Sequence, residues 1–131
     1  MDQIEVFCPG SVANISCGFD VLGFCLEPVG DLMKVTETDK PGITIGSTKG
    51  QDLPKNPLKN VASIAAMALL EAHPSSFGFQ IDIDKRIKPG SGIGSSAASA
   101  AGAVFAINEL LGKPYSRNEL VQYAMAGEAL A

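Results

Sequence analysis

The residues best suited to chemistry form one glycine-rich run: Pro89, Gly90, Ser91, Gly92, Ile93, Gly94, Ser95 and Ser96. Its three glycines can adopt positive φ and let backbone N–H groups approach an anion with no Cβ in the way. A helix expected from Ser95 would add its exposed N–H groups and the positive end of its dipole. The run is therefore predicted to bind phosphate groups, and the two serine hydroxyls suit a phosphate oxygen or Mg²⁺.

Other phosphate-binding loops fit this run less well. A Walker A loop ends in Gly-Lys-Ser/Thr, whereas this run ends in Gly-Ser-Ser without a lysine. A dinucleotide-binding fingerprint would need a third glycine where Ser95 stands, and the glycine loop of protein kinases would need catalytic motifs that are missing from the sequence. The remaining alternative is a purely structural bend before a tightly packed helix.

The elements on either side of the run position it. Phe79, Ile81 and Ile83 alternate with polar residues, which predicts a half-buried strand whose Asp82 and Asp84 face solvent. The residues from Ser95 to Leu111 are rich in Ala, Ser and Gly and predict a helix that packs closely against its neighbours. The order strand, glycine-rich turn, helix is the one that a phosphate site requires.

The rest of the chain predicts further strands and helices. Alternating apolar residues indicate a strand from Met1 to Cys8 that Pro9-Gly10 ends, and a β-prone region over 21–37 broken by a turn at 28–31. Ile43 and Ile45 indicate an edge strand, followed by an exposed loop over 47–57. Apolar residues spaced by three and four predict a helix over 58–72 that His73-Pro74 ends: Val61, Ile64, Ala65, Ala68 and Leu69.

The last predicted helix begins at a capping box. Ser116 and Glu119 have the spacing of that motif, and the apolar positions Leu120, Ala124 and Leu130 follow it. This helix is still running at Ala131, with neither Gly nor Pro to close it. We therefore expect the sequence to continue in a longer protein.

Composition excludes several classes of function. The chain has 131 residues and a formal net charge of −4, so nothing suggests binding to nucleic acid or to an anionic membrane. No apolar run approaches the roughly 20 residues that span a bilayer, and we expect a cytoplasmic protein. With one histidine, His73, neither a histidine triad nor a multi-histidine metal site is available. The three cysteines, Cys8, Cys17 and Cys25, are interpreted as small buried residues.

The segment from Pro89 to Ala98 resembles the second signature of the GHMP family of small-molecule kinases, Pro-x-x-x-Gly-(Leu/Ile)-Gly-Ser-Ser-Ala. The resemblance implies ATP as the phosphoryl donor, with its phosphates held by Gly90 to Ser96. It also implies Ser96 and Glu128 as Mg²⁺ ligands at the catalytic centre, and Asn60 and Val61 beside the adenine. A helix-surface role for Glu128 remains the plain alternative.

A second block indicates which branch of the family is meant. Cys8-Pro9-Gly10-Ser11-Val12-Ala13-Asn14, followed by Gly18-Phe19-Asp20-Val21-Leu22-Gly23, resembles the first signature of the homoserine kinases of that family. The resemblance implies that Asn14 and Asp20 contact an amino-acid substrate, and a carboxylate such as Asp20 can pair with a substrate ammonium. A turn cap at Asn14 and an exposed loop at Asp20 are the structural alternative.

The resemblance implies a fold as well as a reaction. The fold is α+β, a mixed sheet backed by helices with a left-handed βαβ crossover, and residues 1–131 are expected to be its N-terminal, ATP-binding domain. The implied reaction moves the ATP γ-phosphoryl group to the hydroxyl of L-homoserine, with a homodimer open as the assembly. Two alternatives remain, a GHMP enzyme acting on another alcohol and a non-catalytic nucleotide-binding module of the same fold.

Overall fold

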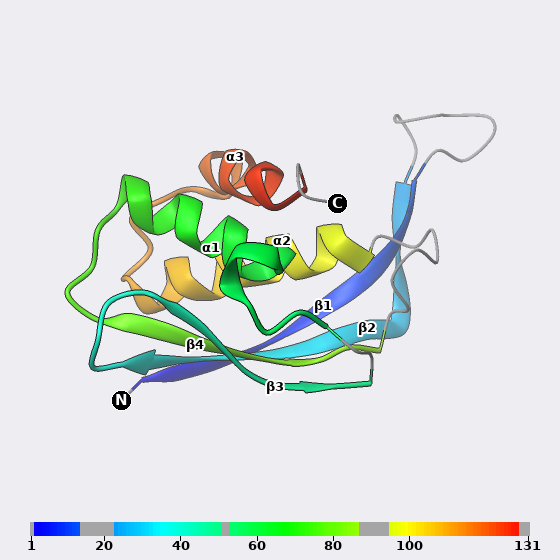
Figure 1. The fold of residues 1–131 in the computed structure, drawn as a ribbon. Helices are drawn as coiled ribbons and strands as arrows, with labels where there is room; N and C mark the ends of the chain where they lie inside the picture. The colour runs from blue at the N-terminus through cyan, green and yellow to red at the C-terminus, as the bar shows by residue number, and fades with distance from the viewer. Residues whose placement is uncertain (1, 14–22, 51–52, 87–94, 129–131) are drawn as a thin grey trace.

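A computed structural model describes residues 2–13, 23–50, 53–86 and 95–128, with side chains at 2–8, 30–50, 53–86 and 97–127. One four-stranded sheet forms the first layer, and three helices lie together on one of its faces (Figure 1). The predicted α+β class, a mixed sheet backed by helices, is confirmed.

The sheet contains both antiparallel and parallel pairs. Its strands are β1 (Gln3–Ala13), β2 (Gly23–Thr38), β3 (Ile43–Lys49) and β4 (Gly78–Asp84), and they lie in the order β1-β2-β4-β3. The β1–β2 and β2–β4 pairs are antiparallel, whereas β3 and β4 are parallel. A parallel pair needs a crossover connection, and the first long helix supplies it here. The left-handed sense of that crossover stays a prediction of the resemblance.

The first two strands are longer than predicted. The expected end of the first strand at Pro9-Gly10 is wrong, because β1 stays paired with β2 as far as Ala13. The break expected at 28–31 is not a turn, because β2 runs through it, although its pairing with β1 is interrupted at residues 27–29. Pro9 is opposite Gly30 while Gly10 is opposite Leu26, so three residues of β2 are extra at this step. An irregularity of this kind tolerates proline at a sheet edge, since the ladder is already interrupted there.

The edge strand predicted at Ile43 and Ile45 is confirmed, but the loop predicted from Ser47 is wrong at its start. Strand β3 continues to Lys49 across a register shift between Ile45 and Thr48. At this shift the Ser47 N–H donates to Asp82 Oδ1 at 2.8 Å. A side-chain acceptor therefore replaces the partner that the interrupted ladder does not provide.

The helices begin and end close to their signals. Their bounds are η1 (Pro57–Lys59), α1 (Val61–Ala72), α2 (Ser95–Leu110) and α3 (Arg117–Glu128). The helix expected from Leu58 is a 3₁₀ turn first, and α1 proper begins after its N-cap, Asn60. The capping box of α3 is confirmed, since the Ser116 N–H donates to Glu119 Oε1 at 2.9 Å. Hydrogen bonds from Ser116 lower the pKa of Glu119.

The core lies between the sheet and the helix layer. The strands contribute large apolar side chains and the helices contribute small ones. The strand members are Met33, Val35, Phe79, Ile81 and Ile83, and the helix members include Ala62, Ala65, Ala66, Ala100, Ala103 and Ala106. The alternation predicted for β4 is thus confirmed, and small helical residues allow the two layers to approach closely.

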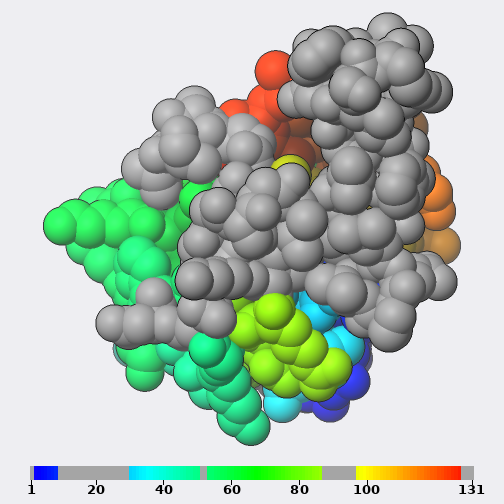
Figure 2. Space-filling model, turned by 90° about the vertical axis from the view of Figure 1, so that its right-hand side faces the viewer, coloured from blue at the N-terminus to red at the C-terminus, as the bar shows by residue number. Residues whose placement is uncertain are grey.

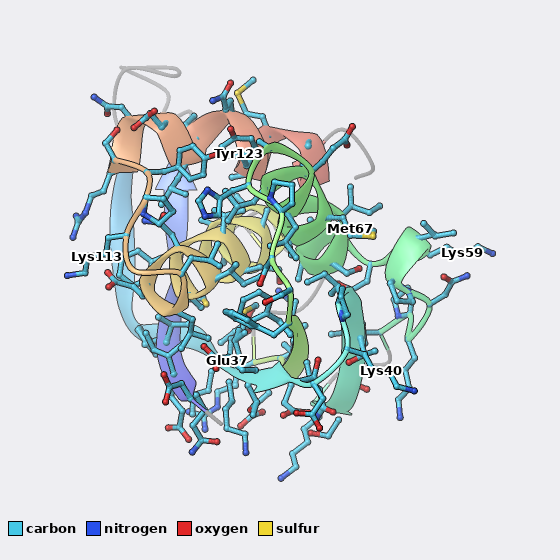
Figure 3. All side chains as sticks on the ribbon, turned by 90° about the vertical axis from the view of Figure 1, so that its left-hand side faces the viewer. Glu37, Lys40, Lys59, Met67, Lys113 and Tyr123 are labelled. Atoms are coloured by element: carbon cyan, nitrogen blue, oxygen red, sulfur yellow. The ribbon has the colours of Figure 1, made fainter. Side chains whose placement is uncertain are left out.

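Aromatic rings close the end of the molecule where α1 ends and α3 begins. Tyr115 lies 5.3 Å from Tyr123 and 5.9 Å from His73, centroid to centroid. Figure 3 views this end and shows Lys113 and Lys40 projecting outward at its rim. His73 caps the C-terminus of α1 as predicted, and its ring additionally packs against Tyr115. In the described part of the chain, no helix has the length and apolar character needed to cross a membrane.

Candidate functional site

The predicted phosphate segment falls at the junction between β4 and α2. Strand β4 ends at Asp84, and α2 begins at Ser95 as predicted. Pro89 to Gly94 lie outside the described residues, as do Asn14 and Asp20.

Two predicted metal ligands lie at helix ends. Ser96 is in the first turn of α2 and Glu128 is the last described residue of α3, and their side chains are outside the described set. Among the side chains that the structure describes, no group of three or more His, Cys, Asp and Glu could hold a metal ion. The roles of Ser96 and Glu128 stay predictions.

A buried ion pair lies directly beside this junction. Lys85 follows the last residue of β4, and its Nζ is 2.6 Å from Asp31 Oδ2 and 2.8 Å from Ser99 Oγ in α2. The other carboxylate oxygen, Asp31 Oδ1, accepts the Arg86 N–H at 2.7 Å. The side chains of Lys85 and Asp31 are only 3% and 1% exposed. The network thus connects β2, the residues after β4 and the start of α2.

Sequence reasoning missed this network, although a signal for it exists. Asp31 has the same phase in β2 as the buried residues Met33 and Val35, and Lys85 has the same phase as Ile83. Side chains two residues apart lie on the same face of a strand. Strand phase thus places both opposite charges on the core face, where each needs a partner of opposite charge.

Cys8 adds a thiol to the same buried cluster. It is opposite Asp31 in the β1–β2 ladder and is 3% exposed. Burial and, to a smaller extent, the nearby Asp31 carboxylate raise the pKa of the Cys8 thiol to about 11, while Lys85 opposes the shift. The prediction of a small buried residue is confirmed for Cys8, whereas the Cys17 and Cys25 side chains lie outside the described residues.

Asn60 uses its amide to build the N-terminus of α1. Its Oδ1 accepts the Ala62 N–H at 3.0 Å, and its Nδ2 donates to the Pro54 carbonyl at 2.9 Å. The residue is 5% exposed. The side chain predicted to be near the adenine is therefore already engaged, and its direct effect is to fix the backbone at Val61.

Val61 lies against the end of α3. A Cβ built on Gly127 would be 2.6 Å from the Val61 carbonyl oxygen and 3.2 Å from Val61 Cγ1. This contact places Val61, which is predicted to lie beside the adenine, next to Gly127, the residue before Glu128. Two segments that the sequence separates by more than sixty positions thus meet at one point.

The ends of all three helices lie at the same end of the molecule. Helices α1 and α2 begin toward the end where β4 stops, and α3 runs back so that it ends there (Figure 1). Figure 2 views that end, with the last residues of β4 beside the described part of β2. Helix N-termini at this end of the molecule favour an anion there.

The sequence profile for the GHMP kinases N terminal domain matches residues 59–131. That match covers more than half of the chain. The chain belongs to the GHMP kinase family. The matched region contains the β4–α2 junction and all three helices.

Individual GHMP kinases resemble the chain along almost its whole length. It is 43% identical to the homoserine kinase of Xanthomonas campestris pv. campestris (strain B100), over 98% of the chain and 41% of that relative. It is 41% identical to the homoserine kinase of Methanococcus maripaludis, over 100% of the chain and 44% of the relative. The crystal structure of homoserine kinase from Cytophaga hutchinsonii superposes with a TM-score of 0.92 at 45% identity, covering 100% of the chain and 42% of that structure. The chain thus spans about two fifths of the length of these GHMP kinases.

Proposed function

We propose that the protein carrying this chain transfers the γ-phosphoryl group of ATP to the side-chain hydroxyl of L-homoserine, giving O-phospho-L-homoserine for threonine biosynthesis. The observation that carries the proposal is the similarity to homoserine kinases over essentially the whole chain, at 41–45% identity. Residues 1–131 would form the N-terminal, ATP-binding part of that enzyme. We further propose that it acts in the cytoplasm, with a homodimer as the assembly to test.

The nucleotide would be held at the β4–α2 junction. Gly90 to Ser96 would supply backbone N–H groups, and the N-terminus of α2 adds a positive dipole end that favours an anion. Asn60 fixes the start of α1 through Ala62, which supports a role for the adjacent Val61 backbone in lining the adenine pocket.

A magnesium ion fits the donor set that the family resemblance implies. A hard cation prefers oxygen ligands, which the Ser96 hydroxyl and the Glu128 carboxylate offer. Helices α2 and α3 run antiparallel, and Ala101 and Ala124 line the same groove between them. About one helical turn toward the site, the chain reaches position 97, next to Ser96, from Ala101, and it reaches Glu128 from Ala124. The two proposed ligands therefore belong to the same end of the helix pair. When bound, Mg²⁺ would neutralise charge on the triphosphate.

The chemistry asks mainly for positioning. The homoserine hydroxyl oxygen bonds to the γ-phosphorus as the bond from that phosphorus to the bridging oxygen of ADP breaks, and the hydroxyl proton is released. Asn14 and Asp20 are proposed to hold the amino-acid part of the substrate, with Asp20 paired to its ammonium group. We assign no general base, because a carboxylate engaged by the ammonium is poorly placed to take the hydroxyl proton.

The test is coupled ADP release by the full-length reading frame with ATP and Mg²⁺. L-homoserine, mevalonate and galactose are supplied in turn, and Ser96→Ala is the matched variant. We expect turnover with homoserine alone, reduced at least about a hundredfold in Ser96→Ala. Turnover with another alcohol would reassign the substrate within the family, and silence with every alcohol would leave a nucleotide-binding module.

The 131 residues alone serve as a second control. They are expected to be inactive, because they span about two fifths of the homoserine kinases they match. ADP release by these residues on addition of homoserine, abolished by Ser96→Ala, would contradict that expectation.

A further inference from the structure

The buried pair of Asp31 and Lys85 is not assigned a role by the proposed reaction. Both side chains lie in the layer between sheet and helices, at most 3% exposed, and a short ion pair joins them. Burying two charges costs desolvation free energy, and replacing such a pair by apolar residues of similar volume is often neutral or stabilising. Stability alone therefore explains the pair poorly.

Two contacts of the pair lie on either side of the segment 87–94. Asp31 Oδ1 holds the Arg86 N–H, one residue before the segment begins. Lys85 Nζ holds Ser99 Oγ, in the turn of α2 that follows Ser95 and Ser96. The pair thus contacts the chain on both sides of the predicted phosphate-binding run, through Asp31 before it and through Lys85 after it.

The backbone of Lys85 is held as firmly as its side chain. Its N–H donates to the Lys49 carbonyl at 2.8 Å, at the end of β3. Gly50, with φ of +86°, lies so close to the Lys85 carbonyl that a Cβ there would overlap it. Because the backbone is fixed by β3, the side chain can transmit that position to α2.

We propose that Asp31 and Lys85 are positioning residues for the nucleotide, setting the distance between the end of β4 and the first turns of α2. The inference rests on the proposed function, because it assumes that this junction holds the triphosphate. Without the pair, the N–H groups of the α2 N-terminus and the Ser96 hydroxyl lose their alignment with the phosphates. ATP is then bound more weakly, whereas a site for homoserine elsewhere in the protein is affected less.

The experiment uses the full-length reading frame with Asp31→Asn, Lys85→Met and the double variant, and Asp84→Asn as the matched control. Asp84 is the neighbouring carboxylate, and it pairs with Arg86 at the exposed surface. We expect the KM for ATP to rise about tenfold or more in the three network variants, with the KM for homoserine within about threefold and Asp84→Asn unchanged. Loss of folded protein alone would lower Vmax and leave both KM values as they are.

The double variant separates positioning from stability. It leaves no uncompensated buried charge, so its melting temperature should exceed that of either single variant, while its KM for ATP stays high. A stable double variant with a normal KM for ATP would overturn the proposal. Tighter ATP binding by Asp31→Asn would also overturn it, because the lysine would then act on the phosphates directly.

Binding of a fluorescent ATP analogue distinguishes this proposal from the proposed reaction. If the unaltered protein binds the analogue but phosphorylates no homoserine, the reaction is wrong and the Kd of the variants still tests the pair. If the unaltered protein phosphorylates homoserine and the variants bind the analogue normally, only the positioning role fails. If the unaltered protein binds no analogue, the proposed reaction and the positioning role of the pair are both wrong.

Discussion

The sulfur of Cys8 occupies the space that a side chain on Gly102 would need. A Cβ on Gly102 would overlap Cys8 Sγ, while the next atoms, Cys8 Cβ and Met33 Cε, would be 3.6 and 3.7 Å away. At this point α2 packs on β1 closely, because Gly102 has no side chain and the Cys8 sulfur lies in the space left free. This contact holds α2 at the height above the sheet that the Lys85–Ser99 hydrogen bond requires.

Gly102→Ala is expected to destabilise the fold by about 1–3 kcal/mol, because the added methyl overpacks the contact with Cys8. Combining it with Cys8→Ala removes the sulfur, and the remaining neighbours are at ordinary contact distance. Alanine also favours a helix interior over glycine by about 1 kcal/mol, so the double variant should be more stable than Cys8→Ala alone. Urea unfolding of the four proteins measures this coupling, and strictly additive effects would contradict it.

The thiol of Cys8 makes stability depend on pH in the alkaline range. Its pKa is raised from 9.0 to about 11 by burial and by Asp31. Between these values the unfolded chain has lost the thiol proton while the folded chain keeps it. The contribution of the thiol to the free energy of unfolding is therefore fully present below pH 9 and is lost as the pH rises to 11. The loss is about 3 kcal/mol from a shift of this size. Cys8→Ala should show a correspondingly smaller decline over this range, and identical declines would refute the assignment.

The N-cap of α1 gives a prediction about Asn60. Asn60→Ala removes both the cap to Ala62 and the hydrogen bond to Pro54, and we expect a loss of about 1–2 kcal/mol. Asn60→Ser keeps a hydroxyl that can cap the helix, so its loss should be smaller. Asn56→Ala is the matched control, because Asn56 caps only the exposed 3₁₀ turn. Equal losses at the two asparagines, measured by chemical denaturation, would show that burial of the cap does not matter.

Much of the fold follows from local signals in the sequence. The alternation at Phe79, Ile81 and Ile83 predicts β4, and the pair Ser116 and Glu119 predicts the start of α3, because each signal acts within a few residues. The β1–β2 pairing was missed, since Pro9-Gly10 indicates a break locally. The hydrogen bonds between the strands on both sides of the register shift outweigh that local signal. They cannot be predicted from neighbouring residues alone.

The site was predicted less completely than the fold. The glycine-rich run and the start of α2 at Ser95 come from composition and spacing, and the family match covers this region. The Asp31–Lys85 pair depends on a contact between residues 54 positions apart. Strand phase alone puts each charge on the core face, but their pairing requires knowing that β2 and β4 are neighbours.

The contact between Gly127 and Val61 connects helix packing to the proposed metal site. A methyl group at 127 would be 2.6 Å from the Val61 carbonyl oxygen and 3.1 Å from Ala65 Cβ. A backbone carbonyl inside a helix cannot rotate away, so α3 must move outward from α1. Gly127→Ala is therefore expected to cost about 1–3 kcal/mol despite the better helix propensity of alanine.

The same movement should change the dependence of the reaction on magnesium. Position 128 moves with α3, so on the proposed function the Mg²⁺ concentration for half-maximal activity should rise about tenfold in Gly127→Ala. Val121→Ala, at a position of the same helix that is 54% exposed, should leave both stability and Mg²⁺ dependence near their original values. Lowered stability with unchanged Mg²⁺ dependence would remove Glu128 from the metal site while keeping the packing argument. Unchanged stability would instead mean that the contact of Gly127 with α1 contributes nothing to the stability of the fold.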